Sequence, residues 1–175
     1  MSYTLSAYAI DLKNLRDTVG EADEKLQKKI IRSNPDEFDD EDDFDPGSGR
    51  VPLATALENL LAGKASLSDD YAQHAYALEE LCRFLAKKDW NGYILDSQKQ
   101  SITRFLDNPP TQLPGSTGLP SIGTIESDEL PRIVDSIKEQ WEIADDGELE
   151  EDASEIIEVF KFAQKKRLGV VLVWG

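Results

Sequence analysis

The chain has 175 residues, with 35 acidic and 19 basic side chains that give a formal net charge of −16. A field of this sign repels phosphate backbones and anionic membrane surfaces, so we expect direct binding neither to nucleic acid nor to a membrane. The single cysteine excludes an intramolecular disulfide, and no apolar run approaches the roughly 20 residues that span a bilayer.

The first part of the chain predicts one strand followed by two helices. Residues 3–10 alternate loosely and are rich in Tyr, Thr and Ala, which favours an edge or half-buried strand. Asp11 is suited to cap a short helix that ends at Gly20, and residues 21–33 predict a second helix. The apolar residues of the two helices that should face inward are Leu12, Leu15, Val19, Leu26, Ile30 and Ile31.

Residues 34–49 predict an acidic surface loop between two helices. Eight acids and no base lie between Asp36 and Asp45. Packing them side by side out of water would be very unfavourable. The loop is either a solubilising spacer or a surface that steers a basic partner, and the spacer is the favoured interpretation.

The acidic run does not fit a calcium loop. In the register that starts at Asp42, Gly47 takes the required glycine position. The positions that should supply oxygen ligands are then occupied by Phe44, Pro46 and Leu53. We therefore expect no metal site here.

The middle of the chain predicts two helices and a polar loop. Pro52 suits a first helical turn, and the helix should stop at Gly63, with Leu53, Leu57, Leu60 and Leu61 along one face. A clearer helix begins near Ser68 and has apolar residues at spacings of three and four. Its inward stripe is Tyr71, His74 or Ala75, Leu78, Leu81 or Cys82, and Leu85. The segment KKDWNGYILD that follows is predicted to be a polar loop.

The second half predicts further helices and a buried final strand. Helices are indicated at 98–107, at 127–142 and at 149–167, the last with acids at its start and bases at its end. Residues 108–123 are a Pro/Gly-rich connection, with a short strand over 121–125. Residues 170–174 are consecutively apolar and predict a strand buried on both faces.

These elements predict an α+β fold. We expect one compact domain over residues 1–175, mostly helical, with a small sheet that includes the N-terminal and C-terminal strands. The wholly apolar last strand should lie in the interior of that sheet.

Four segments together resemble a known family. AIDLKNLRDTVGEADEKL, YALEELCRFL, LPSIGTIESDEL and GVVLVWG occur in the same order in a family of small bacterial proteins catalogued only as a domain of unknown function. The resemblance covers nearly the whole chain, apart from the acidic run. It implies a compact bacterial α+β domain and brings no activity, substrate or cofactor with it.

No catalytic, cofactor-binding or metal-binding residue is predicted. His74 and Cys82 are separated by about 12 Å along one helix, so they cannot act as a nucleophile and its base. We expect Cys82 in the core and His74 on a helix face beside Asp70. Walker, G-x-G-x-x-G and G-x-S-x-G motifs are absent from the sequence.

The charge distribution predicts an interaction protein with a basic protein partner, and an immunity protein that neutralises a nuclease toxin is its concrete form. Residues 36–45 carry −8, and residues 126–155 carry thirteen acids against Arg132 and Lys138. The candidate partner contacts are Trp90, Tyr93, Asp145, Asp146, Glu148, Glu150 and Glu151.

The alternative is a small-ligand-binding protein or a hydrolase that uses surface carboxylates near Trp90. Against it stands the lack of a nucleophile, base and orienting group in one pattern. The N-terminal residues lack the basic and apolar regions of a signal peptide, so we expect a cytoplasmic protein. The sequence does not specify the oligomeric state.

Overall fold

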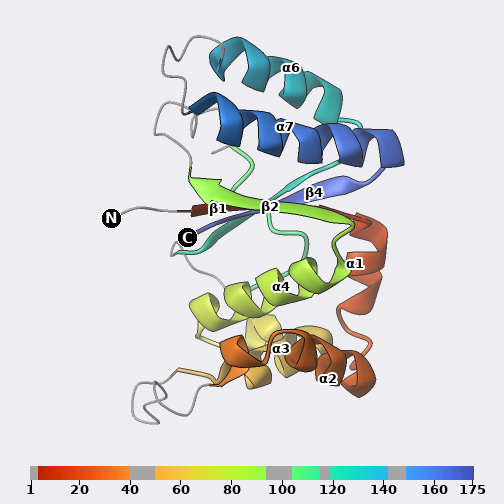
Figure 1. Ribbon diagram of the computed structural model, residues 1–175. Helices are drawn as coiled ribbons and strands as arrows, with labels where there is room; N and C mark the ends of the chain where they lie inside the picture. Colours follow the sequence, from red (N-terminus) through yellow and green to blue (C-terminus); the bar gives the residue numbers. More distant parts are fainter. Residues whose placement is uncertain (1–3, 40–49, 94–103, 115–118, 142–148) are drawn as a thin grey trace. The chain divides into compact units, whose positions relative to one another are not determined.

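The chain forms two compact units, shown in Figure 1. The computed structural model describes residues 4–39, 50–93, 104–114, 119–141 and 149–175, and side chains within the last two helices up to Ser136 and from Ser154 onward. The sheet unit comprises Met1–Leu12, Ala86–Pro110 and Ser121–Gly175, and the helical unit comprises Lys13–Leu85 and Thr111–Pro120. The predicted α+β class is confirmed.

The sheet unit contains a four-stranded antiparallel sheet in the order β2-β1-β4-β3. Its strands are β1 (Thr4–Ile10), β2 (Lys88–Tyr93), β3 (Ser121–Ile125) and β4 (Gly169–Trp174). The first and last strands pair directly, with Ala7 opposite Leu172. This confirms that the sheet includes both terminal strands and that the last strand is interior.

The prediction that the first strand lies at an edge or is half-buried is wrong. β1 is interior, and every residue from Leu5 to Ile10 is buried. Its Ser6 is buried with a partner, because the amide Nδ2 of Asn91 donates to the Ser6 hydroxyl over 2.7 Å. The polar and small side chains of this strand therefore do not indicate that one of its faces is exposed to solvent.

One face of the sheet is covered by α6 (Leu130–Trp141) and α7 (Leu149–Lys166), which lie side by side in Figure 1. Both helices were predicted, within a few residues of these bounds. They bury apolar side chains against Leu5, Ala7 and Leu172 of the strands. The helical residues of this core are Leu130, Ile133, Val134, Ile156, Val159, Phe160 and Ala163.

The segment predicted as a polar loop contains β2, so that prediction is wrong. Trp90 lies on the core side of β2, opposite Ala7. Its indole extends over Gly92, where an added Cβ would lie 2.4 Å from Cζ2 of the ring. Gly92 leaves space for the tryptophan ring, and the polar residues on both sides of Trp90 concealed the strand.

The turn at residues 104–107 packs directly against β3. A Cβ added to Gly123 would lie 1.7 Å from the backbone oxygen of Phe105, so only glycine allows this approach. The strand predicted over 121–125 is confirmed as β3. Most of the helix predicted at 98–107 lies outside the described residues.

The helical unit is built from α2, α3 and α4, which pack on one another. Its elements are α1 (Leu12–Thr18), which starts at the boundary of the units, α2 (Glu24–Ser33), η1 (Pro35–Phe38), α3 (Leu53–Leu61), η2 (Ala65–Leu67) and α4 (Tyr71–Leu85). Their buried apolar residues include the predicted Leu57, Leu60, Leu78 and Leu81. The four predicted helices of this part are confirmed, two of them with later starts.

The later starts follow from two aspartate caps. Oδ1 of Asp23 accepts from the backbone N–H groups of Lys25 and Leu26, so α2 begins at Glu24. Oδ1 of Asp70 accepts from the N–H of Gln73, so α4 begins at Tyr71. In each case the chain before the aspartate is a turn that the apolar periodicity did not reveal.

Removing residues 172–175 should abolish cooperative unfolding. Leu172 is fully buried and is paired on one side with Ala7 and on the other with Gly123, so the deletion separates β1 from β3. Urea unfolding followed by circular dichroism measures this. Deleting Gly175 alone, which removes the backbone and side-chain hydrogen bonds between Gly175 and Thr4, should preserve a cooperative transition. The same transition in both deletions would contradict the prediction.

Candidate functional site

Trp90, expected as an exposed partner contact, is instead a core residue. Its side chain is 8% exposed, and its indole Nε1 donates to Oε2 of Glu155 on α7 over 3.0 Å. The hydrogen bond satisfies the one polar atom of the indole, so the ring can be buried without an unpaired donor. The expected exposure of Trp90 is therefore wrong.

Of the other predicted contacts, only Tyr93 has a side chain that the structure describes. Tyr93 ends β2 and is 60% exposed, so a contact through its ring stays a prediction. Asp145, Asp146 and Glu148 lie outside the described residues. Glu150 and Glu151 belong to the start of α7, and their side chains are not described. A partner contact by these acids also stays a prediction.

His74 and Cys82 are both fully buried on α4. Nδ1 of His74 lies 2.6 Å from the backbone oxygen of Asp70, which can only accept, so Nδ1 donates to it. Nε2 has no hydrogen-bond partner in the described part of the chain. The core position predicted for Cys82 is confirmed, and burial raises the pKa of its thiol.

Cys82 should not react with iodoacetamide while the protein is folded. The thiol is inaccessible and its raised pKa leaves almost no thiolate, which is the reacting form. Mass spectrometry at pH 8 should show no adduct in buffer and complete labelling in concentrated urea, with glutathione as the free-thiol control. Labelling of the folded protein at the rate of glutathione would contradict the burial of this thiol.

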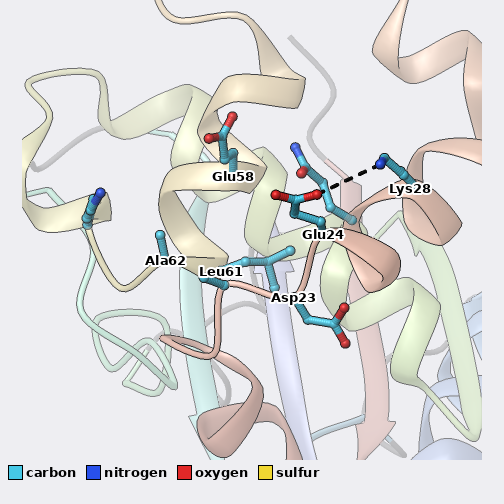
Figure 2. Close-up of a pocket in the computed structure, with 9 residues that line it drawn as sticks. Asp23, Glu24, Lys28, Glu58, Leu61 and Ala62 are labelled. Carbon is cyan, nitrogen blue, oxygen red and sulfur yellow. Dashed lines mark ion pairs between the residues drawn. The ribbon is translucent and has the colours of Figure 1, made fainter.

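A first cavity of about 330 Å³ lies between the start of α2 and the end of α3. Figure 2 shows Glu24 of α2 and Glu58 of α3 on its two sides, with Lys28 turned toward Glu24 at 3.9 Å. Asp23 lines the same cavity, but its carboxylate is engaged in capping α2. Its charged groups are of both signs and exposed, so they bind a ligand only weakly.

A second cavity, of about 310 Å³, contains a buried carboxylate. Glu80 of α4 is 6% exposed and lines this cavity with Arg83 and Phe84, which follow it by three and four positions. The amide Nδ2 of Asn34 donates to its Oε2 over 3.1 Å, and Arg83 pairs with its Oε1 at 2.5 Å. Asn34 reaches Glu80 because it ends α2 as its C-cap. We call this the Glu80 cavity.

Carboxylates crowd around the Glu80 cavity. Burial raises the pKa of the Glu80 carboxyl, and the negative charges of Glu37 and Glu79 raise it further. The Asn34 hydrogen bond and the Arg83 charge act in the opposite direction and do not overcome burial. A carboxyl of raised pKa in a cleft, with a specific charge partner, is a candidate for function. It can take up a proton or a cation.

The acidic run borders this cavity at its described end. Asp36 and Glu37 lie in η1, and Asp39 follows it, all three exposed as predicted for a surface loop. Residues 40–49 lie outside the described residues. Within the described ranges, no group of three or more His, Cys, Asp or Glu side chains is placed to hold a metal ion.

The comparisons with known proteins place the chain in a family without assigning it an activity. A family model described as "Domain of unknown function (DUF7691)" matches residues 1–175. The chain belongs to the DUF7691 family. This confirms the resemblance to a domain of unknown function. The searches of curated proteins and of solved structures gave no significant match. Among the described helices of this DUF7691 protein, none combines the length and the apolar character that a membrane crossing requires.

Replacing Glu80 with Gln should change how stability depends on pH. Since the folded state raises the pKa of Glu80, it binds the proton more tightly than the unfolded chain does, and this contribution is present at low pH. It is lost as pH rises from about 4.5 through the raised value. The unfolding free energy of Glu80→Gln minus that of the natural protein should therefore increase with pH and then level off.

Urea titrations between about pH 5 and pH 8 measure this difference. Asp135→Asn is the matched control, because it removes one carboxylate at an exposed position of α6. A difference that stays constant with pH, or falls as pH rises, would contradict the assignment.

Proposed function

We propose that this DUF7691 protein is a small acidic interaction protein of the bacterial cytoplasm that binds a basic protein partner through the Glu80 cavity. The observation that carries the proposal is a buried carboxylate in a cavity, with Glu37 and Glu79 close enough to oppose its ionisation. A cationic side chain from a partner supplies the charge that this cluster lacks.

The cavity has the chemistry to hold a lysine or arginine side chain. A cation beside Glu80 offsets both the desolvation of the carboxylate and its repulsion by Glu37. Phe84 lines the same cavity and is 37% exposed, so its ring can contact the cation from the apolar side. Arg83 already pairs with Glu79 and Glu80, which keeps both carboxylates oriented before a partner arrives.

The net charge supports the same class of partner. A chain of −16 accelerates its encounter with a cationic surface, and the effect weakens as salt rises. An immunity protein that neutralises a basic nuclease toxin is the concrete form that we favour. Nucleic acids and anionic membranes would be repelled by the same field.

A second set of partner contacts stays a prediction. It consists of Tyr93, which is exposed at the end of β2, and the acids Asp145, Asp146, Glu148, Glu150 and Glu151. The ligand-binding or hydrolase alternative, based on carboxylates near Trp90, receives no support, since the buried indole lines neither the Glu80 cavity nor the cavity between α2 and α3.

Calorimetry with a nona-arginine peptide tests the proposed function. The natural protein should bind it with an affinity that falls as sodium chloride rises from about 50 to 300 mM, while an uncharged Gly-Ser peptide does not bind. The double change Glu37→Gln and Glu80→Gln should lower the affinity about tenfold, because a pair of cation contacts is lost. Asp135→Asn, a charge change on an exposed residue of α6, should lower it less than twofold.

Further variants separate the two surfaces. The predicted contacts of the sheet unit are tested by Tyr93→Ala and by neutralising the five acids at 145–151. A separate variant carries neutral residues in place of the acids at 39–45 and tests whether that part of the acidic run is only a spacer. We expect the spacer variant to bind like the natural protein. Equal affinities for the Glu37/Glu80 double variant and the natural protein would overturn the Glu80 cavity as the binding site.

A further inference from the structure

A third cavity, of about 380 Å³, lies in the sheet unit between the turn at 104–107 and the start of α6. Two arginines line it together with two apolar side chains and two acids. They are Arg104, Phe105, Asp128, Glu129, Arg132 and Ile133. Its volume falls at the lower end of the range for small-molecule sites.

Neither arginine makes an ion pair with any of the residues that the structure describes. Arg104 instead lies over the ring of Phe105, with its Cζ 4.6 Å from the ring centroid. The adjacent Glu129 is engaged elsewhere, because its Oε2 accepts from the backbone N–H of Glu126 over 3.0 Å at the start of α6. In a chain of −16, two arginines that pair with no carboxylate among the described residues face the same cavity.

Both arginines stand on rigid supports. The backbone next to Arg104 is fixed because Phe105 packs directly on Gly123 of β3. Arg132 lies in the first turn of α6, between Leu130 and Ile133, whose side chains are buried in the core. The backbone at both arginines is thus fixed beside the cavity before a ligand binds, which reduces the entropy lost on binding.

We propose that this cavity binds a small organic anion through one carboxylate or phosphate group. Guanidinium groups bind both kinds of oxyanion with paired, charge-assisted hydrogen bonds. Phe105 and Ile133 offer an apolar surface for the body of the ligand. Asp128 and Glu129 line the same cavity and repel additional negative charge, so a ligand with a single anionic group and an apolar body fits best.

Thermal shift and calorimetry with phenyl phosphate and benzoate test this proposal. At least one of them should bind saturably at one site per chain and raise the melting temperature. The tighter of the two identifies the preferred oxyanion. Neutral benzamide and sodium chloride at matched ionic strength should not reproduce the shift, and inorganic phosphate, which lacks the apolar body, should bind more weakly.

Arginine variants locate the site. Arg104→Gln and Arg132→Gln should each weaken binding about tenfold, and the lysine variants should weaken it less because they retain the charge. Arg32→Gln, at an exposed arginine of α2, is the matched control and should bind like the natural protein. Should a glutamine variant fail to fold, its lysine counterpart applies the same test.

Two results would overturn the anion site. One is a thermal shift by phenyl phosphate and benzoate no larger than that of chloride. The other is binding that survives unchanged in the Arg104→Gln and Arg132→Gln double variant. Both concern anions and the sheet unit, so they are distinct from a failure of the Glu80 cavity to bind the basic peptide.

Discussion

The antiparallel pairing of β1 with β4 is the constraint on which the sheet unit depends. β1 carries β2 on its other side and β4 carries β3, so neither edge strand has a place without the central pair. The same pair provides the apolar surface that α6 and α7 cover. The positions of Trp90, of the turn at 104–107 and of the start of α6 all follow from it, since each packs on one of these strands or on the core beneath them.

The protein handles charge in opposite ways at its two candidate sites. In the Glu80 cavity a carboxylate is taken out of water and held by Asn34 and Arg83, although burial and neighbouring acids oppose its ionisation. In the cavity beside α6, two arginines form no ion pair within the part of the chain that the structure describes, although the chain has an excess of acids. Each arrangement leaves a charge that a ligand of the opposite sign can neutralise, which is a more specific property than the overall acidity.

Strong periodicity explains what the sequence could predict. The apolar stripes of α3 and α4 arise because one face of each helix is buried, and the apolar run of β4 arises because the whole strand is buried. These patterns predicted the three elements correctly. β2 was missed because its single large apolar residue, Trp90, depends on Gly92 for space and on Glu155 for its hydrogen bond. Glu155 lies far from Trp90 in the sequence, and a glycine does not by its residue type indicate that it leaves space for an aromatic ring.

The candidate sites were missed for a related reason. The buried stripe of α4 predicted apolar neighbours, and nothing within the helix indicates that Asn34, 46 positions away, reaches Glu80. Arg104 and Arg132 line one cavity because a glycine on β3 admits a backbone turn, and no sequence pattern indicates that close approach.

The order in which the chain assembles is a further consequence of the topology. Thr4 and Gly175 are 171 positions apart yet hydrogen-bonded, so the central sheet requires closure of a very long loop, whereas the α3–α4 pair forms from neighbouring segments. Contacts of such long range slow folding, and a nascent or refolding chain will expose the edges of its unpaired central strands until the last ladder closes.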